Sequence, residues 1–87
     1  MYRELYIDRI NMGRTHLVRN HIRRFRRQID DMTQQDLADR VGVTRQTIVS
    51  IERGRYDPSV GLALRLAQTF GVPVEALFEI EGEDGNV

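Results

Sequence analysis

The sequence predicts an all-α fold, in which five short helices form one small, compact domain. The chain has 87 residues, enough to bury a single modest core. Apolar residues recur every three or four positions, which is the period of a helix with one buried face. Gly, Pro, Thr and Ser separate these periodic segments at the places where helices begin and end. The expected helices cover residues 20–29, 34–41, 45–53, 60–70 and 73–78.

Hydroxyl side chains mark the beginnings of three of these helices. Thr33, Thr44 and Ser59 each precede a periodic segment, where the side-chain oxygen can accept a hydrogen bond from a free backbone N–H. Asp36 lies three residues after Thr33, and its negative charge suits the amino end of the helix dipole. Pro73 fits the first turn of the last helix, because a residue there needs no backbone N–H.

Glycine marks the ends of the same helices. Gly42, Gly54 and Gly71 follow three of the periodic segments, and glycine adopts without strain the left-handed conformation that closes a helix. Asp30 and Asp31 interrupt the pattern after the first helix. The side chains expected to form the core are Ile22, Phe25, Ile29, Leu37, Val41, Ile48, Ile51, Leu66 and Phe70.

The formal net charge of zero conceals two halves of opposite sign. Residues 14–55 contain ten Arg against five acidic residues, a net charge of +5, whereas residues 56–87 contain one Arg against six acidic residues, a net charge of −5. A basic half favours a surface that binds a polyanion, with the acidic end directed away from it. All 13 basic residues are Arg, which binds phosphate and guanine with two parallel hydrogen bonds, although a preference for Arg codons explains this equally well.

The composition excludes several classes of protein. The chain has no Cys, so it has neither disulfides nor thiolate metal sites. No segment reaches the roughly 18 apolar residues that span a bilayer, and a cytoplasmic location is expected. His16 and His21 are isolated imidazoles. No nucleophile and base, ligand cluster or phosphate-binding glycine loop is apparent, so we expect no catalytic residue, metal or cofactor.

Residues 34–53 have the pattern of a helix-turn-helix. Ala38 provides the small side chain that two steeply crossing helices need where they touch, Gly42 provides the turn, and Val43 fills the space beneath it. In the second helix Ile48 and Ile51 share one side. Its other side is mainly polar, so the first helix is expected to support the second at the surface.

The polar side of this second helix suits the major groove of DNA. Arg45 can bind the O6 and N7 atoms of guanine, and Gln46 can bind the N6 and N7 atoms of adenine. Ser50 is a short and adaptable hydrogen-bonding group, and Val49 can touch the methyl group of thymine. We therefore expect Arg45, Gln46, Val49 and Ser50 to read bases.

Other residues around this helix are placed to contact phosphates. Gln34 begins the supporting helix, where its amide and the free backbone N–H groups can bind an anion. Thr44 caps the second helix and can also touch phosphate. Arg53, Arg55 and Tyr56 follow that helix and are expected to hold the DNA backbone further along.

The sequence resembles the lambda-repressor-like, Cro-type helix-turn-helix regulators known as the XRE family, and among them the short single-domain bacterial regulators. The resemblance covers residues 20–80, about two-thirds of the chain. The motifs are IRRFR (22–26), MTQQDLADRVGVTRQTI (32–48), IERGRYDPS (51–59) and LALRLAQTFGVPVEALFE (62–79). Agreement in spacing over so long a run is far more specific than a single A-x-x-x-G.

The resemblance implies roles for matching residues. It implies base contacts at Arg45, Gln46 and Ser50, phosphate contacts at Gln34, Thr44 and residues 53–56, and a structural ion pair between Arg26 and Glu52. Two features depart from the family pattern. The turn before Met32 is one residue longer than in the commonest members, and residues 1–19 have no counterpart in the short ones.

The expected organisation is an N-terminal extension (1–19), a helix-turn-helix DNA-binding domain (20–80) and an acidic flexible tail (81–87). Leu64, Phe78 and Ile80 either close the core or form the contact surface of a two-fold dimer. The favoured interpretation is a sequence-specific regulator of transcription, a repressor that binds double-stranded DNA as a homodimer on an inverted repeat.

Two alternatives keep the same fold. The first is an antitoxin that binds a toxin protein through residues 1–19 and represses its own operon. The second is a protein-interaction module that has lost DNA binding; the acidic C-terminal third allows it, and the polar side of the second helix argues against it.

Overall fold

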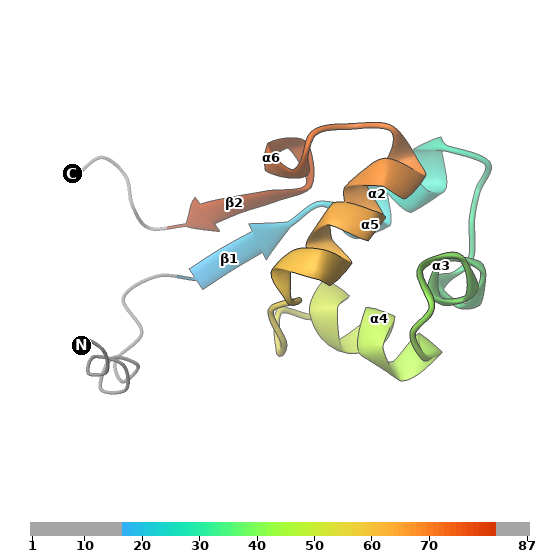
Figure 1. Ribbon diagram of the computed structural model, residues 1–87, viewed down its shortest axis with the longest axis horizontal. Helices are drawn as coiled ribbons and strands as arrows, with labels where there is room; N and C mark the ends of the chain where they lie inside the picture. Colours follow the sequence, from blue (N-terminus) through green and yellow to red (C-terminus); the bar gives the residue numbers. More distant parts are fainter. Residues whose placement is uncertain (1–16, 82–87) are drawn as a thin grey trace.

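The computed structural model describes residues 17–81 and confirms five helices, to which it adds a two-stranded sheet (Figure 1). In chain order the elements are β1 (Leu17–Asn20), α2 (Ile22–Gln28), α3 (Gln34–Val41), α4 (Arg45–Glu52), α5 (Val60–Phe70), α6 (Val74–Leu77) and β2 (Phe78–Glu81). Two helices, α3 and α5, have the limits that the sequence predicts. The helix expected at 45–53 ends one residue earlier, with Arg53 as its C-cap.

The sheet corrects the limits of the first and last expected helices. Strands β1 and β2 are antiparallel, with Leu17 opposite Glu81 and Asn20 opposite Phe78. Helix α2 therefore begins at Ile22 rather than at residue 20, and α6 ends at Leu77 rather than at residue 78. At their other ends α2 stops at Gln28 rather than at residue 29, and α6 starts at Val74, with Pro73 as its N-cap rather than its first residue. The N–H of His21 donates to the Leu77 carbonyl over 2.9 Å. This bond extends the pairing to the first turn of α2, so residues 17–19 of the expected extension belong to the described fold.

The predicted caps are present at the starts of the three longest helices. The side chains of Thr33, Thr44 and Ser59 accept hydrogen bonds from backbone N–H groups in the first turns of α3, α4 and α5. At α3 the bond is reciprocal, because the Asp36 carboxylate accepts the Thr33 N–H over 3.1 Å. Gly42 closes α3 in the left-handed conformation, with φ of 77°. These caps fix where the chain enters and leaves the helix-turn-helix.

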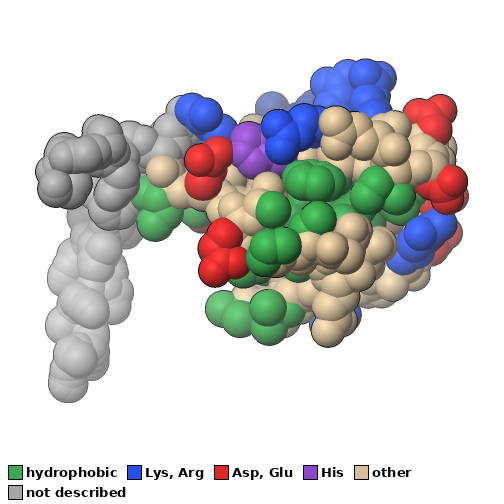
Figure 2. Space-filling view, turned by 90° about the horizontal axis from the view of Figure 1, so that it is seen from above, with side chains coloured by type: hydrophobic (Ala, Val, Ile, Leu, Met, Phe, Trp, Pro, Cys, Tyr) green, Lys and Arg blue, Asp and Glu red, His purple; other side chains and the backbone are tan. Residues whose placement is uncertain are grey.

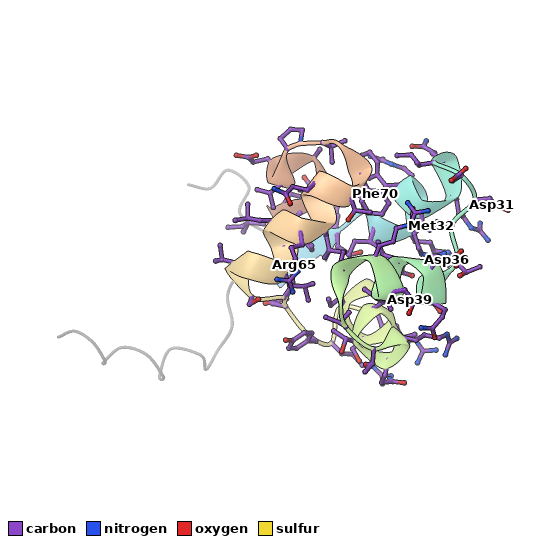
Figure 3. The ribbon with its side chains drawn as sticks, turned by 45° about the vertical axis from the view of Figure 1, so that its right-hand side comes forward. Asp31, Met32, Asp36, Asp39, Arg65 and Phe70 are labelled. Atoms are coloured by element: carbon purple, nitrogen blue, oxygen red, sulfur yellow. The ribbon has the colours of Figure 1, made fainter. Side chains whose placement is uncertain are left out.

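One predicted core residue is exposed. Ile29 is the C-cap of α2 and has an extended backbone, which takes its side chain off the buried stripe and leaves it 37% exposed. Asp30 and Asp31 follow with positive φ angles of 65° and 45°. Figure 3 shows Asp31 at the outer edge of this turn. The chain then turns inward, and Met32, 3% exposed, fills the core on this side.

The other predicted core residues are buried or packed against the core. The rings of Phe25 and Phe70 lie 5.8 Å apart between α2 and α5. The buried apolar residues are Ile22, Met32, Leu37, Ala38, Val41, Ile48, Ile51, Leu62, Leu66, Ala67, Phe70 and Leu77. This cluster contains residues from all five helices, so α3 and α4 are held by the same core as the rest of the domain.

An ion pair between Arg26 and Glu52 joins α2 to α4. Arg26 Nε donates to Glu52 Oε2 over 2.7 Å, and Nη2 donates to Oε1 over 3.1 Å. The two side chains are only 10% and 8% exposed. Arg26 Nη1 also donates to the Met32 carbonyl over 2.7 Å, which fixes the turn before α3. One guanidinium thus positions α2, that turn and the end of α4.

Two further side chains hold the carboxyl ends of α3 and α4. Arg65 of α5 donates from Nε to the Val41 carbonyl over 3.1 Å, and Figure 3 shows its side chain beside α3. Asn20 at the end of β1 donates from Nδ2 to the Ile51 carbonyl over 2.9 Å. Both carbonyls lie in the last turn of a helix, where internal partners run out, and that of Ile51 also accepts the Gly54 N–H over 2.9 Å. They attach the helix-turn-helix to α5 and to the sheet.

Removing one partner of the buried ion pair should destabilise the domain strongly. In Glu52→Leu the Arg26 charge stays buried without its carboxylate, so the free energy of unfolding should fall by about 3–5 kcal/mol. The double variant Arg26→Met/Glu52→Leu removes both charges and should recover most of this loss. Urea denaturation followed by circular dichroism measures both. Glu75→Gln, at an exposed position, is the control, and a Glu52→Leu variant as stable as this control contradicts the assignment.

The capping box at α3 predicts a pH dependence. The Thr33 N–H donates to the Asp36 carboxylate and holds its pKa below the ordinary value of 3.8. A carboxyl whose pKa is lower in the folded state stabilises the fold above its unfolded pKa, and this contribution is lost as the pH falls through the folded pKa. Wild type should therefore be more stable than Asp36→Asn at neutral pH, and the difference should shrink below pH 3.8. Acid titration of both unfolding free energies measures this, and a difference independent of pH contradicts it.

Candidate nucleic-acid interface

Helix α4 has one buried side and one polar side at the surface. Ile48 and Ile51 are completely or almost completely buried, 0% and 1% exposed. Arg45 and Gln46, in the first turn, are exposed, and Ser50 is partly buried. Val49, which is also partly buried, lies one residue before it. The first turn of the helix thus offers a guanidinium and an amide to solvent.

Helix α3 supports α4 from the side. Ala38 is 0% exposed, and its carbonyl accepts the N–H groups of both Gly42 and Val43, over 2.9 and 3.0 Å, in the turn. The two helices cross steeply, with α4 along the lower surface of the molecule (Figure 1). Because Ala38 has only a methyl group, the helices can approach closely at this point. This arrangement leaves the polar side of α4 at the surface of the molecule.

A shallow hollow of about 270 Å³ lies along one side of α4. Five of its six lining residues come from the predicted base-reading and phosphate-binding groups, and the full lining is Thr44, Gln46, Thr47, Ser50, Arg55 and Tyr56. Thr47 was not predicted from the sequence. The Thr47 hydroxyl lies 3.1 Å from the Thr44 hydroxyl. The position of Thr47, a polar residue three places after the N-cap, was the sequence signal that could have placed it beside Thr44.

Gln34 connects Arg45 to the buried ion pair. Arg45 Nη2 donates to Gln34 Oε1 over 3.3 Å, while Gln34 Nε2 donates to Glu52 Oε1 over 3.2 Å. The Gln34 amide, expected to contact phosphate, is therefore already bonded on both sides within the protein. Its carbonyl oxygen orients the guanidinium of Arg45, a base-reading candidate. The side chains of Arg26, Glu52, Gln34 and Arg45 form one continuous chain of hydrogen bonds.

Arg53 lies on the other side of α4 from Arg55 and Tyr56. It borders a second hollow, of about 370 Å³, together with Gln34, Glu52 and residues of α2. Arg53, Arg55 and Tyr56 are all exposed. The predicted phosphate-binding residues after α4 are thus divided between its two flanks rather than gathered at one place. A duplex lying on α4 would meet cationic or polar groups on both flanks.

The three residues expected in a core or dimer surface have different environments. Leu64 and Ile80 are 49% and 55% exposed. Phe78 is partly buried and packs against the core. A mainly apolar hollow of about 190 Å³ lies beside Phe78, between the start of α5 and the sheet, and also includes Val18 and Val60. Leu64 and Ile80 therefore do not complete the core of the monomer.

Other expectations concern residues outside those described. The possible contact of residues 1–19 with a protein partner falls mostly on residues 1–16, outside the described range. The acidic tail expected at 81–87 also lies outside it, except for Glu81, which is the last residue of β2. Between residues 17 and 81, no three His, Asp or Glu side chains are grouped as metal ligands. Within the same range, every helix is too short or too polar to cross a membrane.

Comparison with protein families gives a match over most of the described fold. A family model described as helix-turn-helix matches residues 22–77. These residues run from the start of α2 to the end of α6, so the match includes α3, α4 and both partners of the ion pair.

Three transcriptional regulators are similar to this chain over more than half of its length. An uncharacterized HTH-type transcriptional regulator of Methanocaldococcus jannaschii is 46% identical over 61 residues, 70% of this chain and 92% of that protein. One from Methanothermobacter thermautotrophicus is 48% identical over 69 residues, 78% and 97% of the two chains. The Bacillus subtilis regulator YgzD is 44% identical over 52 residues, 60% and 79% of the two chains. These relatives come from archaea as well as bacteria.

The family match, the identity to these regulators and the exposed polar side of α4 agree with one another. The matched family is one of DNA-binding regulators rather than enzymes. The chain belongs to the XRE-type helix-turn-helix family of transcriptional regulators.

Proposed function

We propose that the chain is a cytoplasmic repressor that binds a specific operator in double-stranded DNA as a homodimer. The observation that carries this proposal is the position of Arg45 and Gln46. Both are exposed in the first turn of α4, while Ile48 on the same helix is buried. The first residues of a recognition helix are those that reach base edges in the major groove. Occupation of a promoter by such a dimer represses transcription directly.

The side chains of α4 can distinguish bases. Arg45 can donate two hydrogen bonds to guanine, and Gln46 can donate and accept with adenine. The bond from Arg45 to Gln34 limits the directions of the guanidinium before DNA arrives, which reduces the entropy lost on binding. Ser50 and Val49 lie further along the helix and complete the predicted contact with the bases.

Phosphate contacts on both flanks of α4 orient the helix in the groove. Arg55 and Tyr56 lie beside Gln46 and Ser50, and Arg53 lies on the opposite flank. Thr44 can donate its hydroxyl proton to phosphate while it caps α4. Contacts of this kind fix the register of a protein on DNA but carry no sequence information.

Homodimerisation is proposed to use the exposed apolar side chains of α5 and β2. Leu64 and Ile80 are exposed, and Phe78 lies beside the apolar hollow. Removing such side chains from water stabilises a dimer by roughly 25 cal/mol per Å² of apolar surface. A two-fold dimer would place its two recognition helices on half-sites about one helical turn, ~10 base pairs, apart. The operator is therefore expected to be an inverted repeat.

Substitutions in the first turn of α4 should lower the affinity for the operator, because each one removes the contact with one base. Arg45→Ala and Gln46→Ala each remove one pair of hydrogen bonds, about 1–3 kcal/mol of discrimination or roughly 5- to 150-fold in affinity. The operator is first recovered by selecting bound fragments of genomic DNA. Gel shifts then compare operator and random duplex. Gln68→Ala, exposed on α5, should bind as wild type does. If both α4 variants also bind operator and random DNA as wild type does, α4 is not the recognition helix.

Charged substitutions in the apolar surface should dissociate the dimer. Leu64→Glu and Ile80→Glu place a carboxylate where desolvation is expected, so both variants should sediment as monomers at concentrations where wild type is a dimer. Ile29→Glu changes an exposed apolar residue at the α2–α3 turn and should leave the dimer intact. Analytical ultracentrifugation distinguishes these species, and circular dichroism checks the fold. Dimers that persist in both surface variants would place the interface elsewhere.

A further inference from the structure

A hollow between α2 and α4 is lined by four arginines and by one acidic residue, Glu52, which is paired with Arg26. Its volume is about 370 Å³, and its lining consists of Arg23, Arg26, Arg27, Gln34, Glu52 and Arg53. The adjoining hollow, of about 530 Å³, shares Arg23 and Arg27 with it and adds Arg24. The space-filling view shows basic side chains gathered along one edge of the molecule (Figure 2). Every cation here is an arginine.

One carboxylate faces this cluster, and it is already paired. Glu52 is the only acidic residue in the lining of either hollow, and its two oxygens accept three hydrogen bonds, two from Arg26 and one from Gln34. Arg23, Arg27 and Arg53 are exposed. Within residues 17–81 none of these three forms an ion pair with a carboxylate. Three guanidinium groups therefore share a small space in which the only carboxylate of the lining, that of Glu52, is already paired with Arg26.

The backbone holds these three arginines in a defined arrangement. Arg23 and Arg27 are four residues apart on α2, which places them on the same side of the helix. The Arg26–Glu52 pair fixes α2 against the end of α4, and Arg53 is the C-cap of α4. The three side chains thus come from two elements whose relative position is set by a buried contact. Arginines spaced along the surface of a single helix would not converge on one hollow in this way.

The hollow adjoins the proposed reading face. Gln34 lines it and also accepts the hydrogen bond from Arg45, so one amide separates the cluster from a base-reading side chain. DNA carries one charge per roughly 1.7 Å of its axis. A duplex with Arg45 at its bases therefore brings the phosphates that flank the groove close to this side of α4. Planar guanidinium groups match a phosphate with two parallel hydrogen bonds.

We propose that Arg23, Arg27 and Arg53 form a phosphate-binding site, called here the α2 site, that holds the DNA backbone beside the recognition helix. This inference rests on the proposed function and extends its contact surface from α4 to α2. It adds residues that carry no base information. The α2 site therefore contributes the same affinity to every duplex and leaves the choice of operator to α4.

The test uses the dependence of binding on salt. Each phosphate contact contributes about 0.9 to the slope of log K against log salt concentration. The double variant Arg23→Gln/Arg27→Gln should lower the magnitude of that slope by about 1.8, which is two contacts, and weaken operator and random duplex by the same factor. Fluorescence anisotropy with both duplexes over a series of KCl concentrations measures these quantities. Because both side chains are exposed, the unfolding midpoint should not change.

Two further variants make the test specific. Arg24→Gln removes one positive charge from the same helix, but Arg24 lies outside the lining of the α2 site and over the ring of Phe25. The salt slope of this variant should therefore stay near that of wild type. Arg23→Lys/Arg27→Lys keeps both charges and should restore the slope. A loss of about 0.9 in the slope of Arg24→Gln, the same per charge as in the double variant, would indicate a general electrostatic field rather than a site and would overturn the inference.

The remaining outcomes separate this inference from the proposed function. If wild type binds its operator in a manner sensitive to Arg45→Ala, but the double Gln variant keeps the full salt slope, the α2 site is wrong and the function stands. If wild type binds no duplex at all, the proposed function itself fails. Titration with pyrophosphate, followed by NMR without DNA, tests a free phosphate compound as the ligand. Tight binding lost in the double variant, with an unchanged slope on DNA, would overturn the assignment to DNA.

Discussion

The ion pair between Arg26 and Glu52 determines how α4, the proposed recognition helix, is held. Two charges that are 10% and 8% exposed lose much of their hydration, and such a loss often cancels the attraction between them. The pair is therefore better understood through what it positions than through the stability it adds. Arg26 fixes the turn at Met32, and Glu52 holds Gln34, which in turn bonds Arg45. A contact between α2 and the end of α4 is thus linked by hydrogen bonds to the first turn of α4, which contains the proposed base-reading residues.

The same pair decides which charges of the molecule are available to a ligand. Arg26 occupies the Glu52 carboxylate, which is the only one that faces the arginines of α2 in this hollow. The guanidinium groups of Arg23 and Arg27 are therefore left without an acidic partner among residues 17–81. At the far end of the chain Glu79 is bonded to His21 over 2.6 Å, which holds the pKa of Glu79 below its usual value. Glu79 thus meets the basic half at the sheet rather than at α4, and its charge does not neutralise the proposed DNA-binding surface.

The parts of the fold that were predicted correctly depend on local signals. Helices α3 and α5 have the expected limits because each has an N-cap and a closing glycine within its own few residues, such as Thr33 and Gly42. The sheet was missed because β1 and β2 are nearly 60 residues apart and each has only four residues. The alternation of Phe78 and Ile80 with acidic residues was the available signal, and it was too short to outweigh the helical pattern before it. Ile29 was misplaced because helical spacing continues past the point where the backbone becomes extended.

The candidate site was predictable in its outward residues and not in their partners. Helical period alone separates Arg45 and Gln46 from the buried Ile48, since the faces of a short helix follow from spacing. Period cannot show that Gln34 bonds to both Glu52 and Arg45, because those partners come together only when three helices pack. The arginines of α2 illustrate the same limit. In the sequence, Arg23, Arg24, Arg26 and Arg27 are one basic run. Folding divides them into a buried structural residue, one stacked on Phe25, and two that converge with Arg53. A basic run can thus be assigned to structure or to DNA binding only after its acidic partners are located.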